Sequence, residues 1–180
     1  KIEVAITAQK KALGYFTHLQ YQSITVGASR LELWGHNQLN ERVHYLPDGA
    51  LLALIGSPLG NTTLLEAGKK ILNTQNPEEF EIPWDGRVIL LMISADGQRW
   101  TMWNDWLGSI PVFHAQIENG RVASSLEPVV VAAAGFSSDN FFMPALVSLL
   151  INGHYLSDWT LYKDMKAIPP DSLIAWDEHG

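Results

Sequence analysis

Short runs of apolar residues separated by turn residues dominate the first third of the chain. They are predicted as strands over residues 13–20, 21–26, 30–34, 43–46 and 50–55. Most of them alternate apolar and polar positions, the pattern of a half-buried strand. Residues 50–55 are apolar throughout and follow the hairpin dipeptide Asp48-Gly49, so this strand is predicted to be covered on both faces. Helices and sheets are therefore expected to form layers.

Hairpin signals recur later in the chain. Further strands are predicted over residues 87–94, 99–103, 111–117, 121–125 and 172–176. Asp96-Gly97 and Asn119-Gly120 separate consecutive members of this set and favour tight turns. The pattern predicts an antiparallel meander. Residues 73–83 are polar and acidic, which indicates a surface loop.

Three helices are predicted from start and stop signals. Asn61 or Thr62 caps the first, which runs to about Asn73. Its buried stripe is expected to comprise Leu64, Leu65, Ile71 and Leu72. The second helix covers residues 127–134 and ends at Gly135. The third ends at Asn152 with Gly153 as its cap, and Pro144 must lie in its first turn because proline lacks the amide hydrogen that a helix interior needs.

Composition excludes several classes of protein. The 180 residues are 47% hydrophobic and 17% charged, as in one globular domain. A net charge of −7 without any basic run argues against nucleic-acid binding. The chain contains no cysteine, which excludes disulfides and cysteine nucleophiles. No apolar run is long enough to span a membrane and no signal-peptide core is evident, so a cytoplasmic protein is expected.

Two motifs carry a family resemblance. Residues 103–113 read WNDWLGSIPVF and are followed at 123–127 by ASSLE. They resemble the R-D-x-x-G-x-x-P-L-Y-Y and A-S-E-x-K-A-L segments of the glutamine amidotransferase domain of asparagine synthetases. Asp105, Gly108 and Pro111 fall in step with the first segment, and Glu127 lies one place late in the second. Later segments are similar too, over about 80 residues in all, whereas the match before residue 85 is much weaker.

The resemblance implies an α+β fold of four layers, αββα, as in N-terminal nucleophile hydrolases. Its two stacked antiparallel sheets are expected to come from residues 12–56 and 87–125. The family continues into an ATP-binding synthetase domain, so residues 1–180 are expected to be the N-terminal piece of a longer protein. ATP and magnesium would bind that downstream domain, because this chain has no S-G-G-x-D-S motif and no phosphate-binding loop.

The chemistry of the family requires residues that this chain lacks. Its nucleophile is an N-terminal cysteine whose own amino group acts as base, whereas this chain begins with Lys1. Trimming to Thr7 would create a hydroxyl nucleophile. However, residues 12–16, which are similar to the family's first strand, have no serine or threonine directly before them. An active glutaminase is therefore not expected.

The family's oxyanion hole is also altered. Its N-G-E-I-Y-N turn corresponds to a segment that begins Ile55-Gly56-Ser57. Ile55 offers no side-chain donor where the family has asparagine, and the loss of one such donor costs ~2.7–4 kcal/mol of transition-state stabilisation. These three residues are predicted to line a degenerate glutamine pocket. Residues 56–60 also fit a simple strand-to-helix connection, which we prefer on their glycine and proline content.

Other residues of the family's glutamine site have no clear counterpart. Its Ser-Asp pair would fall near residues 74–80, which contain no such pair, and Arg30 and Arg42 are the candidates for the carboxylate-binding arginine. Asp105 and Gly108 are typical of a turn held by side-chain to backbone hydrogen bonds. We therefore assign structural roles to Asp105, Gly108, Pro111 and Glu127.

Histidines and tryptophans offer rival interpretations. The six histidines show no metal-binding spacing, so no metal site is predicted. Trp100, Trp103 and Trp106 could form a sugar-stacking platform, although one buried sheet face explains them better. A free-standing module that binds a sugar or an amino acid therefore stands beside the degenerate amidotransferase as an alternative.

The third predicted helix is more apolar than burial of one face requires. Its apolar residues near the end are Leu146, Val147, Leu149, Leu150 and Ile151. One buried face needs a stripe of only ~100°. We therefore expect this helix to dock on a partner, either the synthetase domain or a second copy of the chain.

Overall fold

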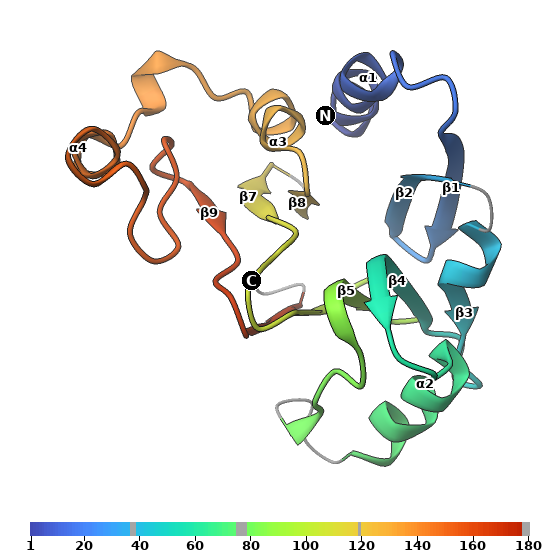
Figure 1. Ribbon diagram of the computed structural model, residues 1–180. Helices are drawn as coiled ribbons and strands as arrows, with labels where there is room; N and C mark the ends of the chain where they lie inside the picture. The colour runs from blue at the N-terminus through green and yellow to red at the C-terminus, as the bar shows by residue number, and fades with distance from the viewer. Residues whose placement is uncertain (37–38, 75–78, 119, 178–180) are drawn as a thin grey trace. The chain divides into compact units, whose positions relative to one another are not determined.

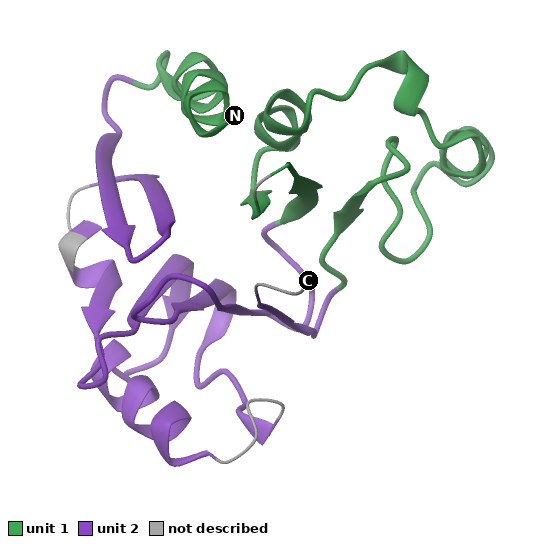
Figure 2. Cartoon of the chain, turned by 180° about the vertical axis from the view of Figure 1, so that it is seen from behind, with its two compact units in different colours: residues 1–16, 111–169 green, residues 17–110, 170–180 purple. Residues whose placement is uncertain are grey.

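The computed structural model describes residues 1–36, 39–74, 79–118 and 120–177. Their helices and antiparallel sheets are drawn in Figure 1. The chain divides into two compact units, coloured in Figure 2. Unit 1 comprises residues 1–16 and 111–169, and unit 2 comprises residues 17–110 and 170–180. The α+β class predicted from the sequence is confirmed.

Unit 2 contains a five-stranded antiparallel sheet. Its strands, in sequence order, are β3 (Val43–Tyr45), β4 (Leu51–Leu59), β5 (Asp85–Ile93), β6 (Trp100–Asn104) and β10 (Leu173–Trp176). Their spatial order is β10-β6-β5-β4-β3. The Asp48-Gly49 turn is confirmed: Asp48 accepts a hydrogen bond from the amide of Ala50, and Gly49 has a positive φ of 86°. The predicted last strand is also confirmed, as β10.

The pairing of β4 with β5 corrects the predicted division into sheets. These strands pair from Leu51 with Ile93 to Leu59 with Asp85, so residues 50–55 and 87–94 belong to one sheet. Residues 113–124 form a separate sheet in unit 1. The prediction assigned whole hairpins to one sheet or the other from their order in the sequence, but long-range pairing between β4 and β5 decides the grouping.

Both faces of the central strands are buried, as their apolar sequence predicts. Leu52, Leu54, Val88 and Leu90 pack in a core with helix α2. The alternate residues Leu51, Ala53, Ile89 and Leu91 are also buried. Since side chains alternate across a strand, both faces of β4 and β5 are buried over residues 51–54 and 88–91.

Helix α2 (Leu64–Asn73) begins one or two residues later than predicted. Thr63 is its N-cap and forms a reciprocal capping box with Glu66, which satisfies amides that an uncapped terminus leaves free. Leu64 and Ile71 are buried as predicted, but Leu65 and Leu72 are exposed at 44% and 45%. Ala67 and Gly68 complete the buried stripe instead. A methyl group on Gly68 would lie 2.5 Å from a Leu46 methyl, so the glycine permits close packing.

Strands β1 (Gln20–Val26) and β2 (Ser29–Gly35) form a hairpin, which confirms the predicted strands over residues 21–26 and 30–34. The strand predicted over residues 13–20 is wrong, as is the first strand expected at residues 12–16. Helix α1 (Ile2–Leu13) ends there instead. Its alanines, with Glu3 in the first turn and Lys10 and Lys11 in the last, favour a helix with a complemented dipole.

Unit 1 contains a three-stranded antiparallel sheet. Its order is β8 (Gly120–Ser124), β7 (Phe113–Ile117) and β9 (Met165–Ala167). Ala115 and Met165 pack against Val130 of helix α3 (Glu127–Ala134). This helix has the predicted bounds, with Gly135 left-handed at its end. Of the predicted Asn119-Gly120 turn, Asn119 lies outside the described residues, as do residues 75–78 of the predicted loop.

The last helix, α4 (Met143–Asn152), ends at Asn152 with Gly153 as its cap, as predicted, and Pro144 lies in its first turn. Ala145 and Ser148 are buried, whereas Val147, Leu150 and Ile151 are exposed. Two short 3₁₀ helices complete the described elements, η1 (Leu39–Arg42) in unit 2 and η3 (Ser138–Asn140) in unit 1. Among the helices described, none is long and apolar enough to cross a bilayer.

Candidate functional site

The carboxylate of Asp105 organises the turn that follows β6. Its Oδ1 accepts hydrogen bonds from the amides of Leu107 and Ser109 and from the Ser109 hydroxyl, at 2.9–3.1 Å. Its Oδ2 accepts from the amide of Val88 in β5 at 3.1 Å. The prediction of an aspartate held by side-chain to backbone bonds is confirmed. The additional bond to Val88 ties the turn to the neighbouring strand.

The environment of Asp105 favours its ionised form. The side chain is buried, which alone would raise its pKa, but the hydrogen bonds from Ser109, Val88 and Leu107 outweigh this effect. The pKa of the Asp105 carboxyl therefore lies below its ordinary value of 3.8. These bonds occupy both carboxylate oxygens, so Asp105 is a structural anchor rather than a free general base.

Gly108 supplies the left-handed backbone conformation that the same turn needs. It has a positive φ of 58°, a conformation that favours glycine. A methyl group on its Cα would also lie 3.2 Å from Pro170. The Asp-x-x-Gly spacing thus reflects one anchored carboxylate and one left-handed residue.

The structure brings the Asp105 turn to the strand segment that was predicted to line the glutamine pocket. Gly56 of β4 pairs with Val88, the residue whose amide Asp105 binds. A methyl group on Gly56 would lie 2.1 Å from the carbonyl oxygen of Arg87 and 2.6 Å from Cδ1 of Ile110. Residues far apart in sequence, at 55–57, 87–88 and 105–110, therefore meet at one end of the five-stranded sheet. We call this group the Gly56 site.

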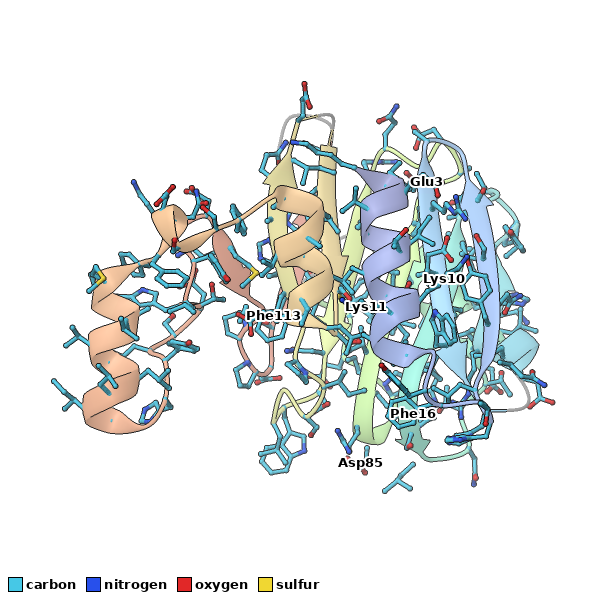
Figure 3. All side chains as sticks on the ribbon, turned by 90° about the horizontal axis from the view of Figure 1, so that it is seen from above. Glu3, Lys10, Lys11, Phe16, Asp85 and Phe113 are labelled. Atoms are coloured by element: carbon cyan, nitrogen blue, oxygen red, sulfur yellow. The ribbon has the colours of Figure 1, made fainter. Side chains whose placement is uncertain are left out.

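Ile55 and Ser57 flank Gly56 within β4. Ile55 is half-buried and pairs with Ile89, whereas Ser57 is exposed and pairs with Arg87. The strand continues to Leu59, so the interpretation of residues 56–60 as a strand-to-helix connection is wrong. Proline and glycine suggested a turn, but Pro58 and Gly56 lie in a strand, and Gly56 takes a φ of 103° there. Asp85, labelled in Figure 3, marks the start of β5 beside this segment.

Arg87 is the member of the site that the sequence analysis missed. Its Nη2 donates to the carbonyl oxygen of Ser109 at 3.1 Å, which links β5 to the Asp105 turn. The family motif does not include this position. The available signal was an arginine at the exposed start of an otherwise apolar strand.

Pro111 and Glu127 belong to unit 1. Pro111 is exposed and precedes the buried Val112, whose carbonyl oxygen accepts from the amide of Ile168. Glu127 is the first residue of α3, and burial raises the pKa of its carboxyl. Neither residue is included in the Gly56 site.

The other candidates for the family's glutamine-binding residues are not among the residues of the Gly56 site. Arg30, a candidate for carboxylate recognition, contacts Glu32 and Ser23 within the β1–β2 hairpin. Arg42, the second candidate, ends η1. The region expected to hold the Ser-Asp pair falls largely on residues 75–78, outside the described part of the chain.

The histidines occupy separate environments. His44 pairs with Leu52 in the sheet of unit 2. Burial, together with the nearby positive charge of Arg121, lowers the pKa of His114, on β7, to about 4. His18 and His36 stack with ring centroids 5.3 Å apart. Over the described residues, histidines and acids form no group of three or more that could hold a metal ion.

The three clustered tryptophans separate in the structure. Trp103 is buried and contacts the ring of Phe80 in the α2 core. Trp100 donates its indole hydrogen to the hydroxyl of Ser29. Trp106, in the turn after β6, is 66% exposed. Burial of Trp103 agrees with the core interpretation, and Trp106 is the exposed ring of the three.

No protein-family model matches the chain, and no curated protein matches it at a significant level. The site presents an exposed serine hydroxyl and an exposed guanidinium beside two half-buried isoleucines.

Proposed function

We propose that the chain is a catalytically degenerate glutamine amidotransferase-like domain of an asparagine synthetase-like or β-lactam synthetase-like amide-forming protein. The observation that carries this proposal is the convergence at the Gly56 site. The resemblance links residues 55–57 and 105–113 to one family, and the structure independently ties Gly56 and Asp105 through Val88. In the family, the equivalent strand segment holds the oxyanion donors.

The proposal includes the four-layer αββα arrangement with two stacked antiparallel sheets. It is supported by burial on both faces of β4 and β5. Helix α2 accounts for one face, and the burial of Leu51, Ala53, Ile89 and Leu91 requires a covering layer on the other.

Loss of glutaminase chemistry follows from two independent departures. The chain has no cysteine, and Ile55 cannot donate the side-chain hydrogen bond of the family's asparagine. Even an added nucleophile would lack that part of the oxyanion hole. Retention of the scaffold without the reaction fits a structural part of a larger enzyme. ATP and magnesium are assigned to the synthetase domain of that enzyme.

We expect the purified chain to release no ammonia from glutamine above the uncatalysed background. The measurement is a coupled ammonia assay, with an active amidotransferase as positive control. Changing Ile55 to Asn should not create activity, because the nucleophile is still lacking. Glutamine turnover that disappears when Ser57 is changed to Ala, or when Thr7 is changed after trimming to that residue, would refute the assignment.

Helix α4 provides the proposed docking surface. Val147 is 48% exposed, and Leu150 and Ile151 are about three-quarters exposed. The helix carries no charged side chain, so any partner must meet it through apolar contacts. The synthetase domain is the proposed partner. When that domain is lacking, α4 is expected to contact a second copy of the chain instead.

Substitution of Leu150 by Glu is expected to abolish weak self-association without loss of stability. Leu150 is 76% exposed, so a charge there costs little in the monomer but opposes an apolar interface. Sedimentation at high protein concentration measures the effect. Leu59→Glu is the matched control, because Leu59 is similarly exposed but lies on β4. Self-association that Leu59→Glu suppresses and Leu150→Glu leaves intact would contradict a role for α4.

A free-standing binding module is the second candidate function. The observation in its favour is the exposure of Trp106 and its neighbour Leu107, which belong to the 105–110 segment of the Gly56 site. Stacking on an exposed indole is a common way to hold a sugar ring. This function requires that the chain binds its ligand without a synthetase domain attached.

A further inference from the structure

Arg87 is an exposed arginine that is tied to the Asp105 turn by a hydrogen bond. Its Nη2 donates to Ser109, and Ser109 is itself held by Asp105. Acidic side chains within the described ranges form no ion pair with Arg87. A guanidinium has five N–H donors in a planar fork, so the bond to Ser109 leaves donors for an anion.

The neighbours of Arg87 define a second chemical requirement. Ser57 lies directly across the ladder from Arg87, and cross-strand partners project on the same face of a sheet. Ile55 is two residues from Ser57, so alternation puts it on that face as well. Ile110 of the Asp105 turn lies against the backbone of Gly56. The Ser57 hydroxyl and the Arg87 guanidinium thus share a face with the apolar side chain of Ile55.

We propose that the Gly56 site binds a small molecule in which a carboxylate lies next to an apolar group, with Arg87 as its anion-binding residue. An arginine fork can hold a carboxylate through two parallel hydrogen bonds, and the Ser57 hydroxyl can donate a third. Ile55 contacts the apolar part. Ile55 stands where the family has an asparagine that donates a hydrogen bond to the side-chain amide oxygen of glutamine. The site therefore favours a ligand with an apolar side chain over glutamine.

This inference rests on the proposed function in taking the site to be a former glutamine pocket. The test uses the whole chain and three small probes: isovalerate, its neutral isostere isovaleramide, and acetate. NMR titration follows the Nε–H resonance of Arg87 at constant ionic strength. Isovalerate is expected to shift this resonance with a millimolar Kd, and isovaleramide and acetate to bind about tenfold more weakly or less.

Two arginine variants make the test specific. Arg87→Gln should weaken isovalerate binding about tenfold or more, measured on the Ser57 amide resonance. Arg99→Gln removes an exposed arginine of the same unit and should leave the affinity unchanged within about twofold. If Arg87→Gln fails to fold, Arg87→Lys keeps the charge without the fork and should still weaken binding.

Equal binding of isovaleramide and isovalerate, or no resonance change with isovalerate, would overturn the carboxylate site. Unchanged affinity in Arg87→Gln would do the same. The ammonia assay separates this failure from that of the proposed function. Glutamine hydrolysis would refute the degenerate amidotransferase, whereas loss of isovalerate binding alone would remove only the ligand assignment.

Discussion

Replacement of Asp105 by Ala is expected to lower the free energy of unfolding by about 3–5 kcal/mol. The buried carboxylate accepts hydrogen bonds from three amides and one hydroxyl. Its removal leaves these donors without their acceptor, and a buried unsatisfied donor costs about 1–3 kcal/mol. Urea denaturation followed by circular dichroism measures the change.

Asp85→Ala is the matched control for this substitution. Asp85 is an exposed aspartate at the start of β5, and its removal should change the free energy of unfolding by less than about 0.5 kcal/mol. Equal effects of the two substitutions would show that the Asp105 turn is not the anchor described above.

The contribution of Asp105 should also depend on pH. Its folded-state pKa lies below the ordinary value of 3.8, so it stabilises the fold fully above that value. The contribution is lost as pH falls from 3.8 through the lower folded-state pKa. The stability difference between the wild type and Asp105→Asn should therefore be constant near neutral pH and shrink in acid. A difference that grows in acid would contradict the assigned ionisation.

Replacement of Gly56 by Ala is expected to cost about 3 kcal/mol or more. Its φ of 103° is strained for any residue with a side chain. The added methyl would also meet the Arg87 carbonyl oxygen at 2.1 Å, which forces β4 and β5 apart. Calorimetry of thermal unfolding measures the loss of unfolding free energy from the transition midpoint and the unfolding enthalpy.

Gly60→Ala separates backbone strain from the clash. Gly60 also has a positive φ, 138°, but the nearest atoms to its added methyl lie 3.7 Å away. Only the strain term of about 1–2 kcal/mol is expected there. If Gly56→Ala were no worse than Gly60→Ala, the close approach at the Gly56 site would be disproved.

Local signals in the sequence predicted the later helices and the hairpins well. Gly135 and Gly153 end their helices as predicted, and both are left-handed. Asp105 and Gly108 form the predicted turn. In each case the residue acts through its own backbone or its immediate neighbours, so a single sequence carries the information.

Features that depend on long-range contacts were predicted less well. The grouping of strands was wrong because the pairing of β4 with β5 joins segments on either side of α2. Helix α1 was missed because Ile6 is its single buried residue and its apolar pattern is weak. Arg87 was missed because its role depends on Ser109, which lies 22 residues further along the chain. Ile55, Gly56 and Ser57 were selected by the family resemblance, and only the structure connects them to Asp105.

The central proposal is that this chain is the degenerate amidotransferase-like part of an amide-forming protein. The most direct test is to sequence the complete reading frame that encodes it. The account predicts that the codon for Gly180 is followed by a domain containing the pyrophosphatase motif S-G-G-x-D-S. A stop codon directly after Gly180 would contradict the account and favour the free-standing binding module.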